Sequence, residues 1–201
     1  MNRKKVRGFS RHLRDHKSRA ALPVNPINFA GLAERHYEYD WLGLAPWRVN
    51  EKPPYPIRRL WVAHLVAGFF SWQRSLQNYA HDYFLAVRIK EPEFADSRLT
   101  VGIEEWKARY EHGYSEQEET LPLPQEYRSI PGVNDLHWTT HRVTYQCTLE
   151  DFQFDRNTGM KFPRYWPYAD EDGTPMVLVQ LGWQWVGRAP AAAITAVALG
   201  S

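Results

Sequence analysis

One stretch, residues 57–80, constrains the fold more than any other part of the sequence. Its apolar and aromatic side chains recur at steps of three or four residues: Ile57, Trp61, Leu65, Phe69, Trp72, Leu76 and Tyr79. Such steps place side chains on one face of an α-helix. The polar residues fall largely on the opposite face: Arg58, Arg59, Arg74, Gln77 and Asn78. The pattern predicts one long core helix, entered through the proline-rich residues 53–56, which stop a helix from beginning earlier.

Alternation with a period of two residues predicts β-strands after this helix. Residues 83–90 and 98–104 alternate in this way, and a loop between them favours an antiparallel pair. Residues 139–149, extended by 152–154, form another predicted strand, and residues 176–186 carry the strongest alternation in the chain. We therefore expect an α+β fold: an antiparallel sheet of about four to six strands with the 57–80 helix packed on one face. Short helices are predicted at residues 28–36, capped by Asn28, and at 104–112.

Three segments lack a clear period and are predicted to be irregular. Residues 36–47 and 163–168 are rich in aromatic side chains, and residues 115–124 are first acidic and then rich in proline. The Asp-, Asn- and Gly-containing runs 155–159 and 170–173 resemble fragments of calcium loops. Turns favour the same residues for backbone reasons, so we interpret both runs as turns.

Charge is distributed unevenly along the chain. Residues 1–19 hold eight of the 25 Lys and Arg residues but only one of the 23 acids, which leaves 17 bases and 22 acids for the rest. We predict a basic N-terminal arm (1–20), one globular α+β domain (21–188) and a C-terminal tail of small residues (189–201). The arm is interpreted as a weakly docked terminus, with a cationic amphipathic helix and a transit peptide as alternatives.

The same features bear on the compartment. No apolar segment follows the basic start, so no secretory signal is predicted, and no apolar run reaches the ~20 residues of a membrane span. The single cysteine, Cys147, excludes an internal disulfide framework and favours a reducing compartment. We expect a cytoplasmic protein.

Motifs for catalysis are absent from the sequence. It contains no glycine-rich phosphate loop, nucleophile elbow or kinase motif. His137 and His141 are four residues apart in a predicted strand and, with Asp135 or His112, offer the beginnings of a zinc site. A metal-assisted hydrolase is therefore one alternative, although a solvated histidine pair explains the spacing equally. No catalytic residue and no cofactor is predicted.

An excess of aromatic residues instead favours a contact surface. Aromatic residues make up 14% of the chain, including nine Trp, and such rings are enriched at protein interfaces. We predict a non-catalytic protein-binding module. Bacterial immunity proteins, which occlude the active site of a toxin, share this general character, although no motif supports the comparison. The predicted partner is a protein with a basic surface, such as a toxin. The candidate contact residues are Tyr37, Tyr39, Trp41, Trp47, Glu116, Glu118, Glu119, Tyr165 and Trp166.

The basic arm supports an alternative hypothesis. Its cations would neutralise phosphates and give a nucleic-acid affinity that falls steeply with salt. The candidate residues for this function are Arg3, Lys4, Lys5, Arg7, Arg11 and Arg14.

Overall fold

The computed structural model describes residues 8–35, 37–44, 47, 52–107, 114–119, 121–159, 162 and 164–190. The helices are α1 (Phe9–Ala20), α2 (Phe29–Arg35), α3 (Tyr55–Leu76) and α5 (Leu149–Asn157). The strands are β1 (Tyr37–Trp41), β2 (Tyr83–Glu91), β3 (Arg98–Ile103), β4 (Tyr114–Glu119), β5 (His137–Thr148), β6 (Arg164–Ala169) and β7 (Pro175–Arg188). Short 3₁₀ turns are η1 (Phe94–Asp96), η2 (Glu104–Trp106), η3 (Gln125–Tyr127) and η4 (Val133–Asp135).

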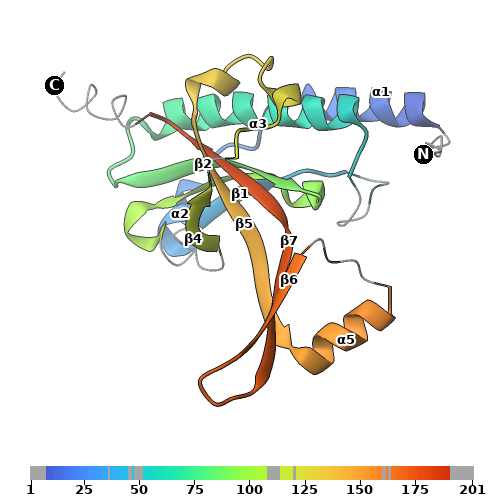
Figure 1. The fold of residues 1–201 in the computed structure, drawn as a ribbon. Coiled ribbons are helices and arrows are strands. Elements are labelled where there is room, and N and C mark those ends of the chain that lie inside the picture. The colour runs from blue at the N-terminus through green and yellow to red at the C-terminus, as the bar shows by residue number, and fades with distance from the viewer. Residues whose placement is uncertain are drawn as a thin grey trace.

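All seven strands of the described residues belong to one antiparallel sheet. Its order is β1-β3-β2-β7-β5-β4, and β6 pairs with β7 beside this path. Helices α1 and α3 lie next to each other along one side of the sheet (Figure 1). The predicted α+β class, with a long helix on an antiparallel sheet, is confirmed, and the sheet has one strand more than the upper end of the expected range.

The long helix α3 carries the main core. It runs for 22 residues from Tyr55, with Pro54 as N-cap, and so begins two residues earlier and ends four residues earlier than predicted. Pro56 is tolerated because the first N–H groups of a helix have no intrahelical partner. The predicted apolar face is buried against the sheet, where Leu85 of β2 and Leu99 of β3 join the same cluster. Arg58 is 6% exposed and does not lie on the solvent face, which corrects the prediction.

Each of the segments predicted to be irregular contains a strand. Residues 37–41 form β1, paired with β3; residues 114–119 form β4, paired with β5; and residues 164–169 form β6, paired with β7. The prediction of irregular structure was wrong there because β1 and β4 pair with strands that are distant in sequence, whereas β6 forms a hairpin with β7 across residues 170–174. Their own side chains are too polar or aromatic to show the usual apolar alternation.

Helix α5 replaces the predicted strand at residues 152–154. The Thr148 Oγ1 accepts a hydrogen bond from the Asp151 N–H at 3.1 Å, which caps the helix directly after β5 ends. A local cap therefore outweighed the apparent alternation. The cap predicted at Asn28 is present, since its side chain accepts from the Gly31 N–H at 2.9 Å. Of the helix predicted at 104–112, the 3₁₀ turn η2 is observed, and residues 108–113 lie outside the described residues.

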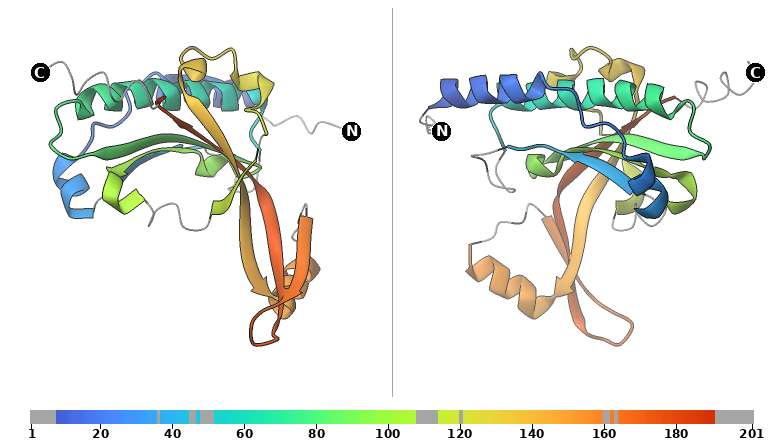
Figure 2. Two further views of the ribbon diagram at one scale, coloured as in Figure 1. Left: turned by 60° about the vertical axis from the view of Figure 1, so that its left-hand side comes forward. Right: turned by 180° about the vertical axis from the view of Figure 1, so that it is seen from behind.

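A β-bulge divides β5 and β7 into two halves. Val143 pairs with Gly182 and Thr144 with Gln180, so one residue of β7 is left over. Beyond the bulge the two strands leave the rest of the molecule together with α5 and β6 (Figures 1 and 2). We call residues 144–182 the projection and the remainder the body. A Cβ on Gly182 would lie 2.0 Å from the Glu91 carbonyl oxygen, so glycine is required where β2 ends against β7.

Helix α1 forms part of the body. Phe9, Leu13 and Ala20 pack against the main core, and His16 is 2% exposed. The Trp61 Nε1–H donates to His16 Nδ1 at 3.4 Å and links α1 to α3. Residues 9–20 therefore form the amphipathic helix that was one of the alternatives, with its apolar face turned inward.

Candidate interaction surface

The projection has a small core of its own. Phe152 of α5 is buried with Val177 and Val179 of β7, and Tyr145, Cys147, Phe162 and Leu181 pack around them. The Phe152 ring lies 4.8 Å from the Tyr165 ring of β6, measured between centroids. This cluster fixes α5 to one face of the three strands.

The opposite face of the projection leaves large side chains exposed. Successive strand residues point to opposite faces, so Trp166 and Tyr168 share one face of the sheet and Tyr165 lies on the other. Both are 38% exposed, and they pair in register with Leu178 and Met176 of β7. The Arg142 guanidinium lies 5.9 Å from the centroid of the Trp166 ring, a cation–π contact that holds the indole in place.

Exposed aromatic side chains and carboxylates gather on the same projection. Phe154 is 67% exposed and Tyr165 is 45% exposed, in addition to Trp166 and Tyr168. Residues 144–182 contain three bases, Arg156, Lys161 and Arg164, against six acids. The acids are Glu150, Asp151, Asp155, Asp170, Glu171 and Asp172. The projection therefore presents apolar rings within a negatively charged surround.

The outer edge of β6 is poorly suited to adding another strand. The Asp170 N–H donates to the Thr174 carbonyl at 3.1 Å, which makes this a hydrogen-bonded pair. Alternation along an antiparallel ladder then directs the backbone groups of residues 165, 167 and 169 away from β7. Residue 167 is a proline, so the middle donor on that edge is missing. A partner would contact side chains here instead of extending the sheet.

The structure separates the predicted contact residues into different regions. Tyr165 and Trp166 lie on the projection, on its two faces. Trp47 is half-buried beside α1, with its ring 5.3 Å from that of His16. The remaining candidates lie in strands whose backbone alone is described: Tyr37, Tyr39 and Trp41 in β1, and Glu116, Glu118 and Glu119 in β4. Phe154 and Tyr168 were missed, because residues 152–154 were assigned to a strand and residue 168 to a loop.

The candidates for the alternative functions lie elsewhere. Arg11 and Arg14 are exposed on α1, whereas Arg3, Lys4, Lys5 and Arg7 lie outside the described residues. His137 and His141 both lie on β5, and the Thr139 Oγ1 is 3.0 Å from His141 Nε2. The part of the chain that the structure describes contains no group of three or more His, Cys, Asp or Glu side chains able to hold a metal ion. Nor does any described helix have the length and apolar character to span a membrane.

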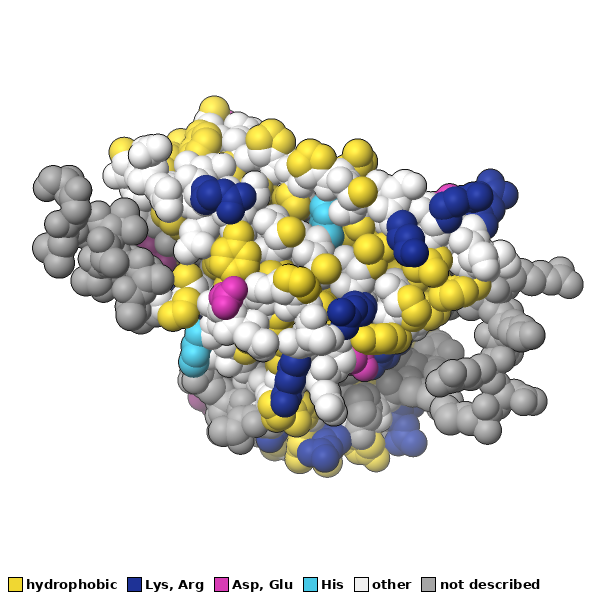
Figure 3. Space-filling view, turned by 90° about the horizontal axis from the view of Figure 1, so that it is seen from above, with side chains coloured by type: hydrophobic (Ala, Val, Ile, Leu, Met, Phe, Trp, Pro, Cys, Tyr) yellow, Lys and Arg dark blue, Asp and Glu magenta, His cyan; other side chains and the backbone are white. Residues whose placement is uncertain are grey.

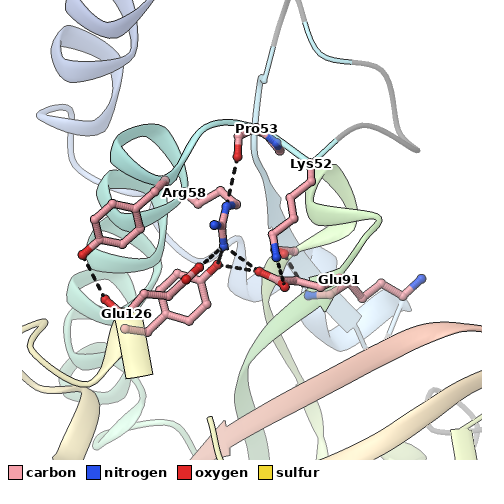
Figure 4. A network of polar contacts seen from close by, with 9 residues as sticks. Lys52, Pro53, Arg58, Glu91 and Glu126 are labelled. Atoms are coloured by element: carbon pink, nitrogen blue, oxygen red, sulfur yellow. Dashed lines mark hydrogen bonds and ion pairs between the residues drawn. The ribbon is translucent and has the colours of Figure 1, made fainter. Parts of the chain in front are cut away.

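A buried polar network on the body is satisfied internally (Figure 4). The Arg58 guanidinium donates to Glu91 Oε1 at 2.7 Å, to Glu126 and to the Tyr127 hydroxyl, and its Nε donates to the Pro53 carbonyl. The Tyr127 hydroxyl donates to Glu91 Oε1 at 2.8 Å. Burial raises the pKa of Tyr127, and the Glu91 carboxylate raises it further. The network joins α3 to β2 and η3, and its two carboxylates are paired with two cations, Arg58 and Lys52, so we interpret it as structural.

Comparisons with protein-family models, curated proteins and solved structures found no match for this chain.

Proposed function

We propose that this chain is a non-catalytic protein-binding module that uses its projection to engage a basic surface of another protein. The observation that supports this proposal is the set of exposed rings, Phe154, Tyr165, Trp166 and Tyr168, on an acidic unit that extends away from the body. Aromatic anchors surrounded by polar groups are typical of the energetically dominant part of a protein interface. The carboxylates would speed association with a cationic partner.

The two faces of the projection have different roles in this proposal. Trp166, held by Arg142, is a rigid anchor on the open face, and an ordered ring loses little conformational entropy on binding. The tip residues Asp170, Glu171 and Asp172 steer the partner from a distance. In its more specific form, the proposal is that the partner is a toxin whose active site is occluded, as expected from the sequence.

Site-specific crosslinking tests the binding proposal. A photoreactive phenylalanine analogue placed at residue 168 should crosslink one protein in the native host, whereas the same analogue at Phe29, exposed on the body, should not. The crosslinked protein is then purified and titrated against the chain. Trp166→Ala should weaken the complex by about 2 kcal/mol, near thirtyfold in Kd. Equal crosslinking from both positions, or an unchanged Kd, would remove the projection as the binding surface.

Charge reversal tests the steering. Glu171→Lys with Asp172→Lys should reduce the association rate at low salt and have a smaller effect at high salt. Toxin neutralisation is tested separately: the purified partner should lose its enzymatic activity when it is mixed with this chain at an equimolar ratio. A stable complex in which the partner remains fully active would refute neutralisation and leave the binding proposal intact.

A further inference from the structure

Helices α1 and α3 together form one outer layer of the body, on the side away from the projection (Figures 1 and 2). The apolar face of α1 is already packed, because Phe9, Leu13 and Ala20 contact the main core. The opposite side of α1 therefore faces solvent, and Arg11, Arg14 and Ser18 lie along it, all exposed. The outer ridge of α1 is basic.

The outer side of α3 is apolar and lies beside this ridge. Leu60 and Ala67 lie on the side of α3 away from the buried face. Ala63 and Phe70 border them at steps of three or four residues and also pack against the main core. Ala67 is exposed and the other three are half-buried. A soluble surface helix normally places polar residues at such positions, so this stripe is unusual.

The charge of the two helices is strongly one-sided. Their residues include seven Lys or Arg and a single acid, Asp15, and α3 contains no Asp or Glu. The bases are Arg11, Arg14, Lys17, Arg19, Arg58, Arg59 and Arg74. Arg58 is buried, Arg19 donates to the Gly43 carbonyl and the half-buried Arg59 donates to Ser129. The exposed bases of the two helices are therefore Arg11, Arg14, Lys17 and Arg74. Figure 3 shows this face, with apolar side chains over its middle, Lys and Arg side chains around them and few acids.

We propose that this helical face docks on the surface of an anionic lipid bilayer. The exposed bases would lie at the level of the lipid phosphates, and the α3 stripe would rest against the boundary with the acyl chains. Nucleic acid fits the face less well, because Ala and Leu side chains neither donate to phosphates nor stack on bases. The proposal is independent of the function proposed for the projection.

Vesicle flotation tests the proposal with the full chain. The chain should float with phosphatidylcholine vesicles that contain phosphatidylglycerol, remain unbound to phosphatidylcholine alone, and dissociate as salt is added. Arg11→Gln with Arg14→Gln should reduce the partition coefficient about fivefold for each charge removed. Arg156→Gln with Arg164→Gln removes the same charge from the projection and should leave binding unchanged. Circular dichroism should show both variants folded, because all four side chains are exposed.

A second variant separates the helical face from the bases at residues 3–7. Ala67→Glu places a carboxylate in the middle of the α3 stripe and should also abolish flotation with anionic vesicles. If Ala67→Glu floats like the wild-type chain, the face is not the docking surface and the proposal is wrong. Equal binding to neutral vesicles would overturn it as well. The proposal is also wrong if the wild-type chain fails to float but binds a short DNA duplex, and if the Arg11→Gln, Arg14→Gln variant loses that DNA binding.

Discussion

At the scale of single residues, Arg58 has the largest expected effect on stability. Its guanidinium is buried between Glu91, Glu126 and Tyr127, so its removal takes the buried cation away from the Glu91 carboxylate, whose side chain is 12% exposed, and from the more exposed Glu126. We expect Arg58→Met to lower the free energy of unfolding by about 3–5 kcal/mol, because an uncompensated buried charge is costly. Urea denaturation monitored by fluorescence measures this change.

Lys52 provides the matched control. It pairs with the same Glu91 carboxylate, but its side chain is 45% exposed. Lys52→Met should therefore cost less than about 1 kcal/mol. Similar losses for the two variants would show that the network does not depend on the buried guanidinium.

Cys147 yields a prediction about pH. Burial raises the pKa of the Cys147 thiol above its ordinary value. The unfolded chain therefore ionises first, and the folded state loses relative stability as pH rises through the unfolded pKa of about 8.5 towards the folded one. The stability of Cys147→Ala should lack this decline, which denaturation at a series of pH values from 7 to about 10 would reveal. Parallel pH profiles for the two proteins would contradict the prediction.

At the scale of elements, the bulge at Gly182 is the critical junction. A methyl group there would meet the Glu91 carbonyl, so Gly182→Ala should cost about 3 kcal/mol and disturb amide chemical shifts in both the body and the projection. Gly173 has φ +79° but no heavy atom within 4 Å of a built Cβ. Gly173→Ala should cost about 1 kcal/mol, from backbone conformation alone, with shifts confined to its turn. Global shifts from Gly173→Ala would refute the distinction.

The sequence predicted those elements whose side chains carry a long, regular pattern. Helix α3 buries one face, and this burial imposes a period of about 3.6 on its apolar residues. Strands β2 and β3 are buried on both faces along most of their length and carry largely apolar runs. Strands β1 and β4 depend on partners far along the chain. Strand β6 forms a hairpin with β7, but each of its residues is exposed, so burial imposes no apolar alternation on Arg164–Ala169. Tyr165 and Trp166 were predicted to be contact residues because the chain is rich in aromatic residues. The bulge that makes the projection was not predictable, because it arises from the register of β5 against β7.

At the scale of the whole molecule, two cores of different size share one sheet. The body cluster joins α3 to β2, β3 and β7, whereas Phe152, Val177 and Val179 are the buried residues of the projection cluster. Less buried apolar surface means a smaller free energy of local opening. We expect the amides of α5 to exchange with deuterium faster than those of α3, measured by mass spectrometry in native buffer. Equal protection would indicate that body and projection open as one unit.

The central position of β7 has a consequence for how the chain folds as it is synthesised. Strands β2 and β5 are joined only through β7 within the described sheet, and β7 follows every other described strand in the sequence. Until residues 175–188 leave the ribosome, the chain consists of two sheet fragments with open edges, which are prone to pair with other chains. We therefore expect the sheet to close only once β7 is available, and incomplete chains that lack β7 to be the form most prone to aggregate.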